Sequence, residues 1–422
     1  MKKVIATFLF IALTTFPAFA QQLSAEEQKI ISYIDNHSTD AETLLEKLVN
    51  IESPTENLKG VRDVGKVFDT NFQSIGFKTK WLEMPAEMKR AGHFFAERTG
   101  TKGKRILLIG HMDTVLSGEK FRCEGNLGYG TGSSDMKGGD VVMFRALKAL
   151  YETGALKDTQ IIVLLTGDEE DSGDPDSVSR GDMVALAKRS DLVLSYENGG
   201  DKFATVARRG SSSWVLEVTA KTGHSSQIFK DAMSNGAIFE ASRILNQFYE
   251  TLRSEKYLTF NPSLISGGTE VTENAQSISA TGKTNVVPAK VIVRGDLRFI
   301  TEVQKEMART KMREIVAKNL SGTSATIKFF DGIPSMPPTE GNYNILKQLN
   351  QVSLDLGFGV VEAVDPGERG AGDILYIANL LPGLDGLGVS GAKAHAKGEY
   401  VDLDSLPRQT KRTALLIYRL TR

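Results

Sequence analysis

Short, continuous apolar runs that alternate with helical patterns constrain the fold of this chain more than any other feature of its sequence. The runs at residues 105–109, 161–165 and 192–196 are rich in leucine, isoleucine and valine and are bounded by glycine or charged residues. Runs of this length suit strands that are covered on both faces. Residues 24–50 and 141–151 show the apolar spacing of helices. Together these patterns predict an α/β fold with a mixed or mostly parallel sheet flanked by helices.

The pattern changes at about residue 211. Residues 212–220 alternate, and a helical stretch, further strand-like stretches, a second helix and a last strand follow up to residue 330. The order β-α-β-β-α-β predicts an inserted α+β, ferredoxin-like domain. Beyond Pro334 the α/β pattern returns. We therefore expect a discontinuous outer domain and one inserted domain, with these ranges: 1–20 a signal peptide, 21–210 and 331–422 the two parts of the outer domain, and 211–330 the inserted domain.

The first twenty residues differ in kind from the rest of the chain. Lys2 and Lys3 precede an apolar stretch from Val4 to Phe16, and Ala18-Phe19-Ala20 is a small-residue cleavage pattern. This arrangement predicts a cleavable signal peptide and a periplasmic or secreted protein. The apolar stretch is too short to span a bilayer, and no later stretch is long and apolar enough to do so. We therefore expect no stable membrane anchor.

Composition excludes several classes of partner and of site. The 422 residues carry 51 basic and 52 acidic side chains, a formal net charge of −1. This balance gives no electrostatic reason to expect nucleic acid as a partner. Cys123 is the single cysteine, so an internal disulfide and a cysteine-rich zinc site are both excluded. We expect Cys123 to be a small, buried apolar residue.

Side chains able to bind metals follow the predicted strands of the outer domain. The first strand leads into Gly110-His111-Met112-Asp113-Thr114, the second into Gly167-Asp168-Glu169-Glu170, and the third into Glu197-Asn198. A fourth strand-like run, Leu387–Val389, leads to His395. Ligands of open α/β sheets collect at the carboxyl ends of the strands. Any one of these residues alone has an ordinary explanation, but several buried carboxylates together are costly unless cations neutralise them.

A glycine-rich loop, Gly130 to Gly139, lies between the first two of these strands and opens a helix. It lacks the lysine-serine ending of a phosphate-binding loop, so nucleotide binding is discounted. Asp135 in this loop, taken alone, is explained as a helix N-cap.

Imidazoles and carboxylates without thiolates favour zinc, with manganese or cobalt as alternatives. Five such ligands are too many for one open catalytic zinc and suit two ions that share a bridging ligand. Two ions about 3.5–4 Å apart can hold a hydroxide and polarise a carbonyl together, which points to hydrolysis.

These motifs resemble a known superfamily, the dizinc peptidases that include bacterial glutamate carboxypeptidase, aminoacylase and succinyl-diaminopimelate desuccinylase. The resemblance covers essentially the whole chain after residue 20, in order, and rests on the motifs 110–115, 134–139 and 168–170 together with Glu197 and His395. It is closest in character to bacterial glutamate carboxypeptidase, partly because of the export signal. It implies a zinc exopeptidase-like catalytic domain with an inserted lid and dimerisation domain.

The resemblance also implies a role for each ligand. His111 and Glu197 would bind one zinc ion, Glu170 and His395 the other, and Asp135 would bridge the two.

Two further carboxylates take roles from the same resemblance. Glu169 would be the general base, taking a proton from the bridging water and passing it to the leaving nitrogen. Asp113 would orient the imidazole of His111. The peptide bond after the bridging aspartate, Asp135-Met136, is expected to be cis.

The resemblance extends to the inserted domain. His224 matches a lid histidine that in dimers reaches the active site of the neighbouring subunit and stabilises the oxyanion. The family often has His-Ala-Gly where this chain has His224-Ser225-Ser226. Arg298 resembles a lid arginine that grips the terminal carboxylate of the substrate, with a solvated strand charge as its alternative. Asn285 resembles a lid asparagine that helps bind substrate. For Arg208 and Arg209, at the hinge, a solvated pair of charges is a sufficient interpretation.

We therefore predict an exported enzyme with two zinc ions that forms a homodimer through its lid domain. Its predicted reaction is carboxypeptidase cleavage of an amide bond in a small peptide or N-acyl amino acid, releasing a C-terminal amino acid such as glutamate. The alternatives are an N-acyl-amino-acid deacylase or a dipeptidase on the same scaffold. From a different class, a non-catalytic periplasmic binding protein is the alternative, against which the intact Glu169 stands.

Overall fold

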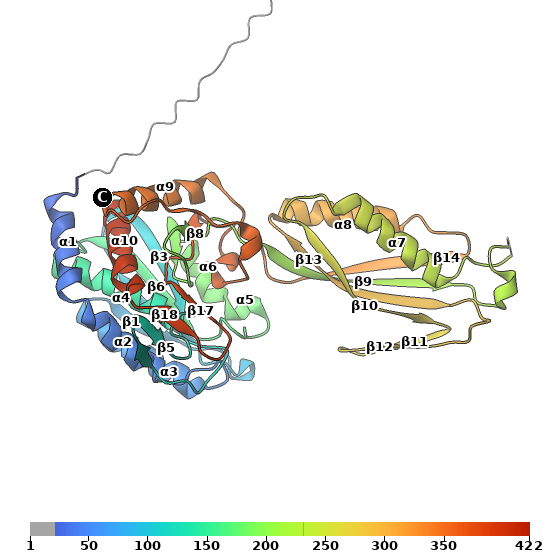
Figure 1. The fold of residues 1–422 in the computed structure, drawn as a ribbon, viewed down its shortest axis with the longest axis horizontal. Helices are drawn as coiled ribbons and strands as arrows, with labels where there is room; N and C mark the ends of the chain where they lie inside the picture. Colours follow the sequence, from blue (N-terminus) through green and yellow to red (C-terminus); the bar gives the residue numbers. More distant parts are fainter. Residues whose placement is uncertain (1–21, 231) are drawn as a thin grey trace, which may run out of the picture.

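The computed structural model describes residues 22–230 and 232–422, so the predicted signal peptide lies outside the described residues. The chain forms two lobes, joined where two segments cross between them (Figure 1). The larger lobe comprises residues 22–209 and 332–422, and the smaller lobe comprises residues 210–331. Among the described residues, no helix has the length and apolar character needed to cross a membrane.

A six-stranded sheet forms the centre of the larger lobe, in the order β1-β2-β6-β3-β7-β16. The strands β6, β3, β7 and β16 are parallel to one another, whereas β2 is antiparallel to both β1 and β6. The sheet is therefore mixed, and the predicted fold class is confirmed. The bounds are β1 Lys78–Leu82, β2 His93–Arg98, β3 Lys102–His111, β6 Thr159–Thr166, β7 Leu192–Ser195 and β16 Gly383–Leu384.

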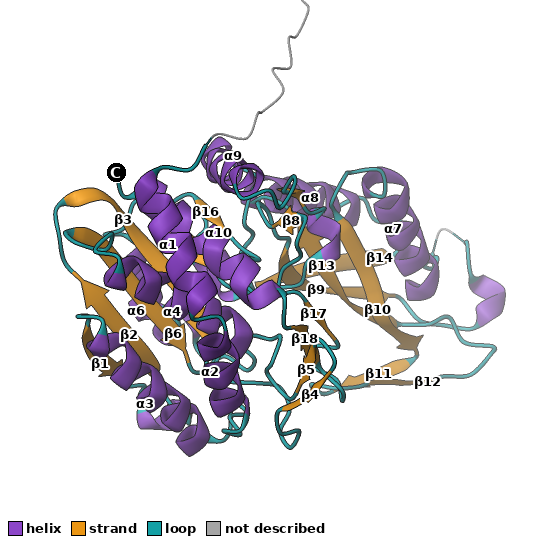
Figure 2. Cartoon of the chain, turned by 60° about the vertical axis from the view of Figure 1, so that its left-hand side comes forward, coloured by secondary structure: helices purple, strands orange, loops and turns teal. Residues whose placement is uncertain are grey.

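Both faces of this sheet are buried, as the continuous apolar runs predict. Along β3, Ile106 and Leu108 pack into one hydrophobic cluster, while Leu107 and Ile109 pack into another on the opposite face. Figure 2 shows the helices that cover the sheet. The helices of this lobe are α1 Ala25–Asn36, α2 Thr39–Val49, α3 Leu58–Ser74, α4 Lys137–Glu152, α5 Asp176–Ser179, α6 Gly181–Ala187, α9 Glu340–Asp355 and α10 Ser405–Leu420, with the short 3₁₀ turns η1 Ala86–Met88, η3 Pro366–Glu368 and η4 Asp373–Tyr376.

Two small sheets complete the larger lobe, and two predictions fail there. The small sheets contain β4 Arg122–Glu124, β5 Leu127–Tyr129, β17 Gly391–Ala392 and β18 Tyr400–Asp402, and the pair β8 Phe203–Ala204 and β15 Glu362–Ala363. Cys123, on β4, is exposed rather than buried. The predicted strand Leu387–Val389 is wrong. The strand at this place is β16, which ends at Leu384, three residues before Leu387. Gly386, with a φ of +74°, breaks the extended backbone between them.

The smaller lobe is an antiparallel sheet in the order β10-β13-β9-β14, with two helices on one face. On β9 the alternating residues Trp214, Leu216 and Val218 are fully buried against these helices, as their period of two predicts. The bounds are β9 Gly210–Ala220, β10 Thr259–Gly268, β13 Lys290–Phe299, β14 Thr323–Asp331, the hairpin β11 Glu270–Glu273 and β12 Ile278–Thr281, the helices α7 Ala237–Leu252 and α8 Glu302–Val316, and the turn η2 Ser225–Gln227.

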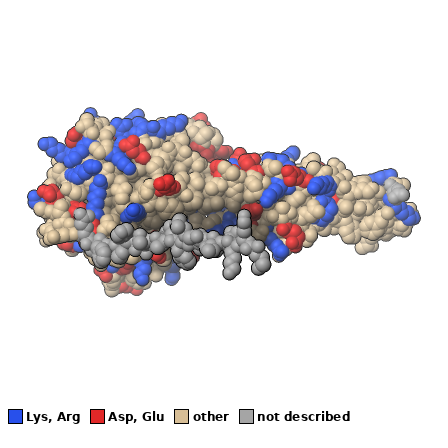
Figure 3. All heavy atoms as spheres, turned by 90° about the horizontal axis from the view of Figure 1, so that it is seen from above, with Lys and Arg blue, Asp and Glu red and all other residues tan. Residues whose placement is uncertain are grey.

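Charged side chains of both signs are interspersed over both lobes on the face that Figure 3 shows. This distribution agrees with the near-zero net charge of the chain. A face with mixed charges offers no extended field of one sign to attract a polyanion.

Candidate active site

Three parallel strands bring the candidate metal ligands of the larger lobe together. His111 is the last residue of β3, Glu169 and Glu170 follow β6, and Glu197 follows β7. Because β6, β3 and β7 are adjacent and parallel, their carboxyl ends meet at one edge of the sheet. Asp135 reaches this edge from the glycine-rich loop before α4, and His395 reaches it from the loop between β17 and β18.

Asp135 lies at the centre of the cluster and presents one carboxylate oxygen to each side. Its Oδ1 is 3.3 Å from Nε2 of His111, and its Oδ2 is 3.2 Å from Nε2 of His395. On the first side, Oε1 of Glu197 is 3.7 Å from Nε2 of His111. On the second side, Oε2 of Glu170 is 3.0 Å from Nε2 of His395. The five residues thus form two groups that share Asp135.

The cluster suits divalent cations. Burial raises the pKa of Glu197 to about 8 and that of Glu170 to about 7. These carboxylates are therefore costly as anions in this place unless positive charge is close to them. Oε1 of Glu170 is buried without a hydrogen-bond partner among the described residues. Donor atoms of His111, Asp135 and Glu170 lie within 4.8 Å of one another, as do those of His111, Glu169 and Glu197. Nitrogen and oxygen donors at this spacing fit metal ions of the zinc type.

Asp113 contacts both His111 and the segment that carries Glu169 and Glu170. One of its oxygens is 3.5 Å from Nδ1 of His111, on the side of the imidazole that faces away from Asp135. Its two oxygens also accept hydrogen bonds from the backbone N–H groups of Glu169 and Glu170, both at 3.1 Å, and one accepts a hydrogen bond from Thr55 Oγ1 at 2.7 Å. Asp113 is therefore placed to hold both an imidazole and the segment that carries the two glutamates.

Glu169 and Glu170 point to different sides of the cluster, although they are neighbours in sequence. Oε2 of Glu169 is 4.0 Å from Nε2 of His111, whereas Glu170 lies against His395. Both glutamates line a cavity of about 370 Å³. Its other lining residues are Asp135, Glu197, Asn198, Arg208, Ile333, Arg369, Gly370, Ala371 and His395.

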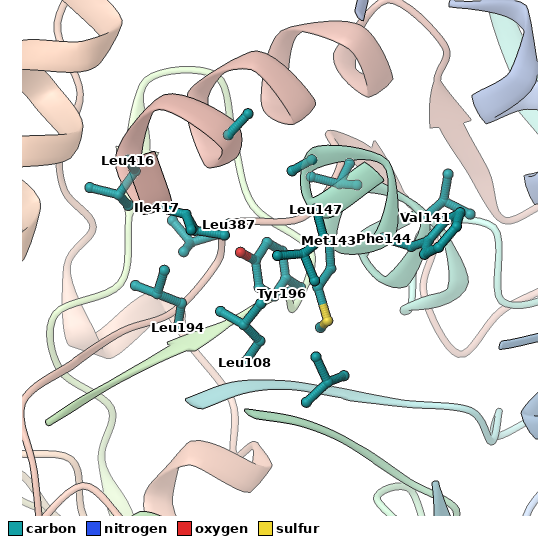
Figure 4. Close-up of a cluster of buried hydrophobic side chains, with 14 of the residues drawn as sticks. Leu108, Val141, Met143, Phe144, Leu147, Leu194, Tyr196, Leu387, Leu416 and Ile417 are labelled. Carbon is teal, nitrogen blue, oxygen red and sulfur yellow. The ribbon is translucent and has the colours of Figure 1, made fainter. Parts of the chain in front are cut away.

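The glycine-rich loop serves close packing rather than phosphate binding. A Cβ atom on Gly139 would lie 2.0 Å from the carbonyl oxygen of Tyr196, and one on Gly138 would lie 2.5 Å from that of Ser133. The Tyr196 ring is fully buried among the side chains drawn in Figure 4, next to Glu197 in the chain. Close contact between α4 and the end of β7 thus fixes the position of Glu197. The peptide bond Asp135-Met136 is cis, as expected.

The lid residues predicted from the resemblance do not reach this cavity within one chain. His224 is exposed and follows β9, whose eleven residues span roughly 35 Å from the hinge at Gly210. Asn285 is also exposed, and its carbonyl oxygen accepts a hydrogen bond from Ser225 N at 2.9 Å, so these two lid segments lie together. Arg298 lies near the hinge end of β13, exposed, with its Nε donating to Asp296 at 3.2 Å.

One family accounts for this chain. The family described as peptidase family M20/M25/M40 matches residues 107–419, about three quarters of the chain. The chain belongs to this family. Members of the M20 family are metal-dependent hydrolases, so the chain is a metallohydrolase, and the predicted resemblance to the dizinc peptidase superfamily is confirmed. A non-catalytic binding protein is thereby excluded as its class.

Curated relatives and solved structures agree with this M20 assignment. Carboxypeptidase G2 from Pseudomonas sp. (strain RS-16) is 28% identical over 88% of this chain and 87% of its own length. Succinyl-diaminopimelate desuccinylase from Acidovorax ebreus (strain TPSY) is 26% identical over 88% of this chain and 96% of its own length. Aminopeptidase PepT from Bacillus cereus ATCC 10987 has the same fold, with a TM-score of 0.70 at 18% identity over 91% of this chain and 99% of its own.

A dinuclear metal-binding M20 peptidase from Bacillus subtilis, YXEP, also shares the fold. Its TM-score is 0.63 at 14% identity over 92% of this chain and 99% of its own.

Two arginines that line the cavity were not predicted as site residues from the sequence. Arg208 is 2% exposed and not a solvated charge, because it forms an ion pair with Asp385 and donates hydrogen bonds to the carbonyl oxygens of Gly370 and Ala371. Arg369 donates to the backbone and side-chain oxygens of Asn198, at 2.8 and 3.4 Å. Arg208 lies in the short connection between β8 and β9, and Arg369 follows the turn η3. Neither shows a periodic pattern, so only the spatial fold identifies them.

Proposed function

We propose that this metallohydrolase is a zinc-dependent carboxypeptidase that cleaves an amide bond and releases a C-terminal amino acid such as glutamate. The observation that carries the proposal is a half-buried arginine in the same cavity as the metal-competent cluster. Arg369 lines this cavity with Glu169, Asp135 and His395. A cation beside the cluster can select substrates that carry a free carboxylate next to the amide bond.

Arg369 forms no ion pair among residues 22–230 and 232–422. Both of its side-chain hydrogen bonds go to Asn198, and its Nε is buried without any hydrogen bond. Burial, together with the positive charge of Arg208, lowers the pKa of Arg369. Because buried charges are normally paired, an unpaired guanidinium in a cavity favours an anionic ligand there. A guanidinium can bind a carboxylate through two hydrogen bonds at once.

The residues of the cluster divide the remaining work. Two cations held by His111, Glu197, Asp135, Glu170 and His395 would supply an activated water molecule and polarise the scissile carbonyl. Glu169 lines the cavity without contacting His395, so its carboxylate stays available to take a proton and return it to the leaving nitrogen. Asp113 keeps the His111 ring and the backbone of residues 169–170 in place.

The lid residues complete the proposal. We assign His224 to the oxyanion of the neighbouring subunit, because the length of β9 separates it from the cavity of its own chain. Arg298 lies near the hinge and would add a second cation for the substrate carboxylate once the lobes close, while Asn285 lies beside the His224 segment and would contact substrate with it.

Dimerisation would use the outer surface of the smaller lobe. Helix α7 exposes Ile238, Phe239 and Tyr249 by 47%, 54% and 51%, beside the edge strand β10 with Ile265 exposed by 54%. An exposed apolar patch next to a free strand edge suits a second copy of the chain. Light scattering should give a dimer mass for the wild type and a monomer mass for Ile238→Glu, and a monomeric wild type would contradict this assignment.

Export is proposed on the residues of the amino terminus alone. Lys2 and Lys3, the apolar stretch to Phe16 and the cleavage pattern at Ala20 support it. Protein recovered from the periplasm or the medium should begin at Gln21, and full-length protein confined to the cytoplasm would contradict export.

The experiment on substrate class uses zinc-loaded protein and paired substrates. N-acyl amino acids, folates and dipeptides are incubated with the enzyme, each beside its C-terminal ester, and the products are identified by mass. We expect cleavage of carboxylate-bearing substrates, with kcat/KM for the esters lower by about 10–100-fold. Dipeptides as the preferred substrates would instead favour a dipeptidase, and release of the acyl group with no preference for the amino acid would favour a deacylase.

A variant links this preference to Arg369. Arg369→Met should lower kcat/KM for the carboxylate substrates about 10–100-fold and leave the esters nearly unchanged. Arg122→Met, at an exposed position of the same lobe, is the matched control and should change neither. Equal losses on acid and ester would contradict a contact between Arg369 and the substrate carboxylate.

A further inference from the structure

A buried carboxylate outside the ligand set joins the two loops that carry Asp135 and His395. Glu399 is 4% exposed. Its Oε2 accepts a hydrogen bond from the backbone N–H of Gly132 at 2.7 Å. Its Oε1 accepts hydrogen bonds from the N–H groups of Ser134 and Asp135, at 2.8 and 2.9 Å. One side chain therefore satisfies three backbone donors in the four residues that end at Asp135.

No basic side chain forms an ion pair with Glu399 within the described ranges 22–230 and 232–422. The nearest candidate in sequence to the loop, Lys137, instead donates to the carbonyl oxygens of Leu48 and Ile51. A buried carboxylate is costly, and here three amide hydrogen bonds offset that cost. The arrangement is thus a carboxylate held only by the backbone of one loop, and in return it fixes the conformation of that loop.

Glu399 also belongs to the loop that carries the other ligand. It lies four residues after His395, and its neighbour Gly398 donates a hydrogen bond to Glu119 at 2.8 Å. Its own carbonyl oxygen accepts a hydrogen bond from Gly130 N at 3.0 Å. Both the backbone and the side chain of Glu399 therefore bind the segment 130–135. The separation between Asp135 and His395 is set across this contact.

The His395 loop needs such an anchor. His395 has a φ of +61°, a left-handed conformation that residues other than glycine adopt rarely. Its side chain is 52% exposed, so packing does little to hold the imidazole in place. The Asp135 backbone, by contrast, is tied down through its own N–H and that of Ser134. Through the hydrogen bonds of Glu399, the loop that carries Asp135 can position the exposed loop that carries His395.

We propose that Glu399 is a positioning residue that sets the distance between Asp135 and His395 and thereby the metal affinity of the cluster. The inference rests on the proposed function only in that both require metal ions at these ligands. It concerns affinity rather than chemistry, so it can fail while the proposed function stands. Removal of a hydrogen-bond partner behind a metal ligand costs about 10–100-fold in metal affinity.

Glu399→Gln is the principal test. The amide oxygen of glutamine can keep the hydrogen bonds from Ser134 and Asp135, but its NH₂ group then faces the N–H of Gly132, donor against donor. We expect the dissociation constant for Zn²⁺, measured by competition with a chromophoric chelator, to rise about 10–100-fold. The absorption spectrum of the Co²⁺-loaded variant should change in band position or intensity, because ligand geometry has changed.

A second variant and a control complete the design. Glu399→Asp shortens the side chain by one methylene, so it keeps the charge but cannot reach all three amides, and it should also weaken Zn²⁺ binding. Glu124→Gln removes an exposed carboxylate on β4, in the small sheet that β18 joins just after Glu399, and should bind Zn²⁺ as the wild type does. Thermal unfolding of the metal-free proteins is measured for each variant.

The outcomes separate the two ideas. Weaker Zn²⁺ binding in both Glu399 variants, with metal-free unfolding temperatures close to that of the wild type, supports the proposal. Wild-type Zn²⁺ affinity in both variants overturns it, and so does loss of the fold in both metal-free variants, since the role would then be structural. A wild-type protein that binds Zn²⁺ but cleaves no amide overturns the proposed function alone.

Discussion

The candidate residues of the larger lobe and those of the smaller lobe are held in different ways. His111 and Asp113 are at most 1% exposed, and each contacts other members of the cluster. His224, Asn285 and Arg298 are exposed, and their hydrogen bonds are to nearby residues of the smaller lobe. The first group is complete in one chain and one conformation. The second group can act only after a movement of the lobes or through a second chain.

This difference follows from the kind of scaffold. In the larger lobe, parallel strands end at one edge, so residues far apart in sequence meet there without further adjustment. In the smaller lobe, antiparallel strands run away from the hinge (Figure 1), and His224 lies four residues beyond the last residue of β9. Catalytic residues at the end of such a lobe can contact substrate only if the lobe moves or a second chain presents its cavity to them. Variants in the two lobes should therefore fail in different ways.

The largest expected effect is in the larger lobe. Glu169→Gln should lower kcat by about 10²–10⁴-fold while zinc content stays unchanged, because a general base is lost and a ligand is not. Metal analysis and turnover are measured on the same sample. Asp171→Asn, an exposed position two residues along the same loop, is the control and should keep wild-type turnover. Full turnover of Glu169→Gln would remove this residue from the mechanism.

His224→Ala tests whether a residue of the smaller lobe acts on the cavity of a second chain. It should lower kcat by about 10²–10³-fold, the usual cost of one oxyanion donor. If His224 acts on the neighbouring subunit, mixing His224→Ala with Glu169→Gln should restore part of the activity, since a mixed dimer contains one intact site. Activity that never recovers after subunit exchange, which mass measurement can verify, would place His224 in the cavity of its own chain.

Arg298→Ala is expected to act on binding, and less strongly. KM for carboxylate-bearing substrates should rise by about 10–100-fold, with a much smaller rise for their esters. Steady-state kinetics on acid and ester pairs measure this difference. The same KM change on both members of each pair would indicate that Arg298 is only a solvated strand charge beside Asp296.

The smallest effect is on stability near the hinge. A hydrogen bond from Arg309, and to a smaller extent one from Lys305, lowers the pKa of Asp331, the last residue of β14. Because the folded pKa lies below the unfolded value, the stabilisation is present at neutral pH and is lost as pH falls through the folded pKa. Asp331→Asn should thus lower the unfolding temperature by no more than a few degrees at pH 7 and by less in acid. If the unfolding temperature of Asp331→Asn fell further below that of the wild type as pH decreases, this prediction would be contradicted.

Much of the larger lobe could be predicted from its sequence. The runs around Ile109 and Leu164 are long, continuous and apolar, and such runs form buried parallel strands whose ends meet. His111, Glu170 and Glu197 each follow one of these runs directly, so their convergence required only the sheet. The alternation through Trp214 and Leu216 likewise predicted the half-buried sheet of the smaller lobe.

Other parts could not be predicted, because spatial contacts determine them. The run Leu387–Val389 has a glycine at its centre, and a Cβ atom on Gly388 would lie 2.3 Å from the carbonyl oxygen of Tyr196. The run hydrogen-bonds to the backbone that follows β7 without forming a regular strand. Arg369 and Glu399 lie in irregular loops with no period. Their roles come from hydrogen-bond partners far away in the chain: Asn198 is 171 residues from Arg369, and Gly132 is 267 residues from Glu399.

Diffraction from crystals of the zinc-loaded protein, recorded at the zinc absorption edge, tests the central claim most directly. We expect two anomalous peaks roughly 3.5–4 Å apart. Asp135 should contact both, His111 and Glu197 one of them, and Glu170 and His395 the other. A single peak that Asp135 does not touch, or zinc bound only elsewhere on the molecule, would contradict it.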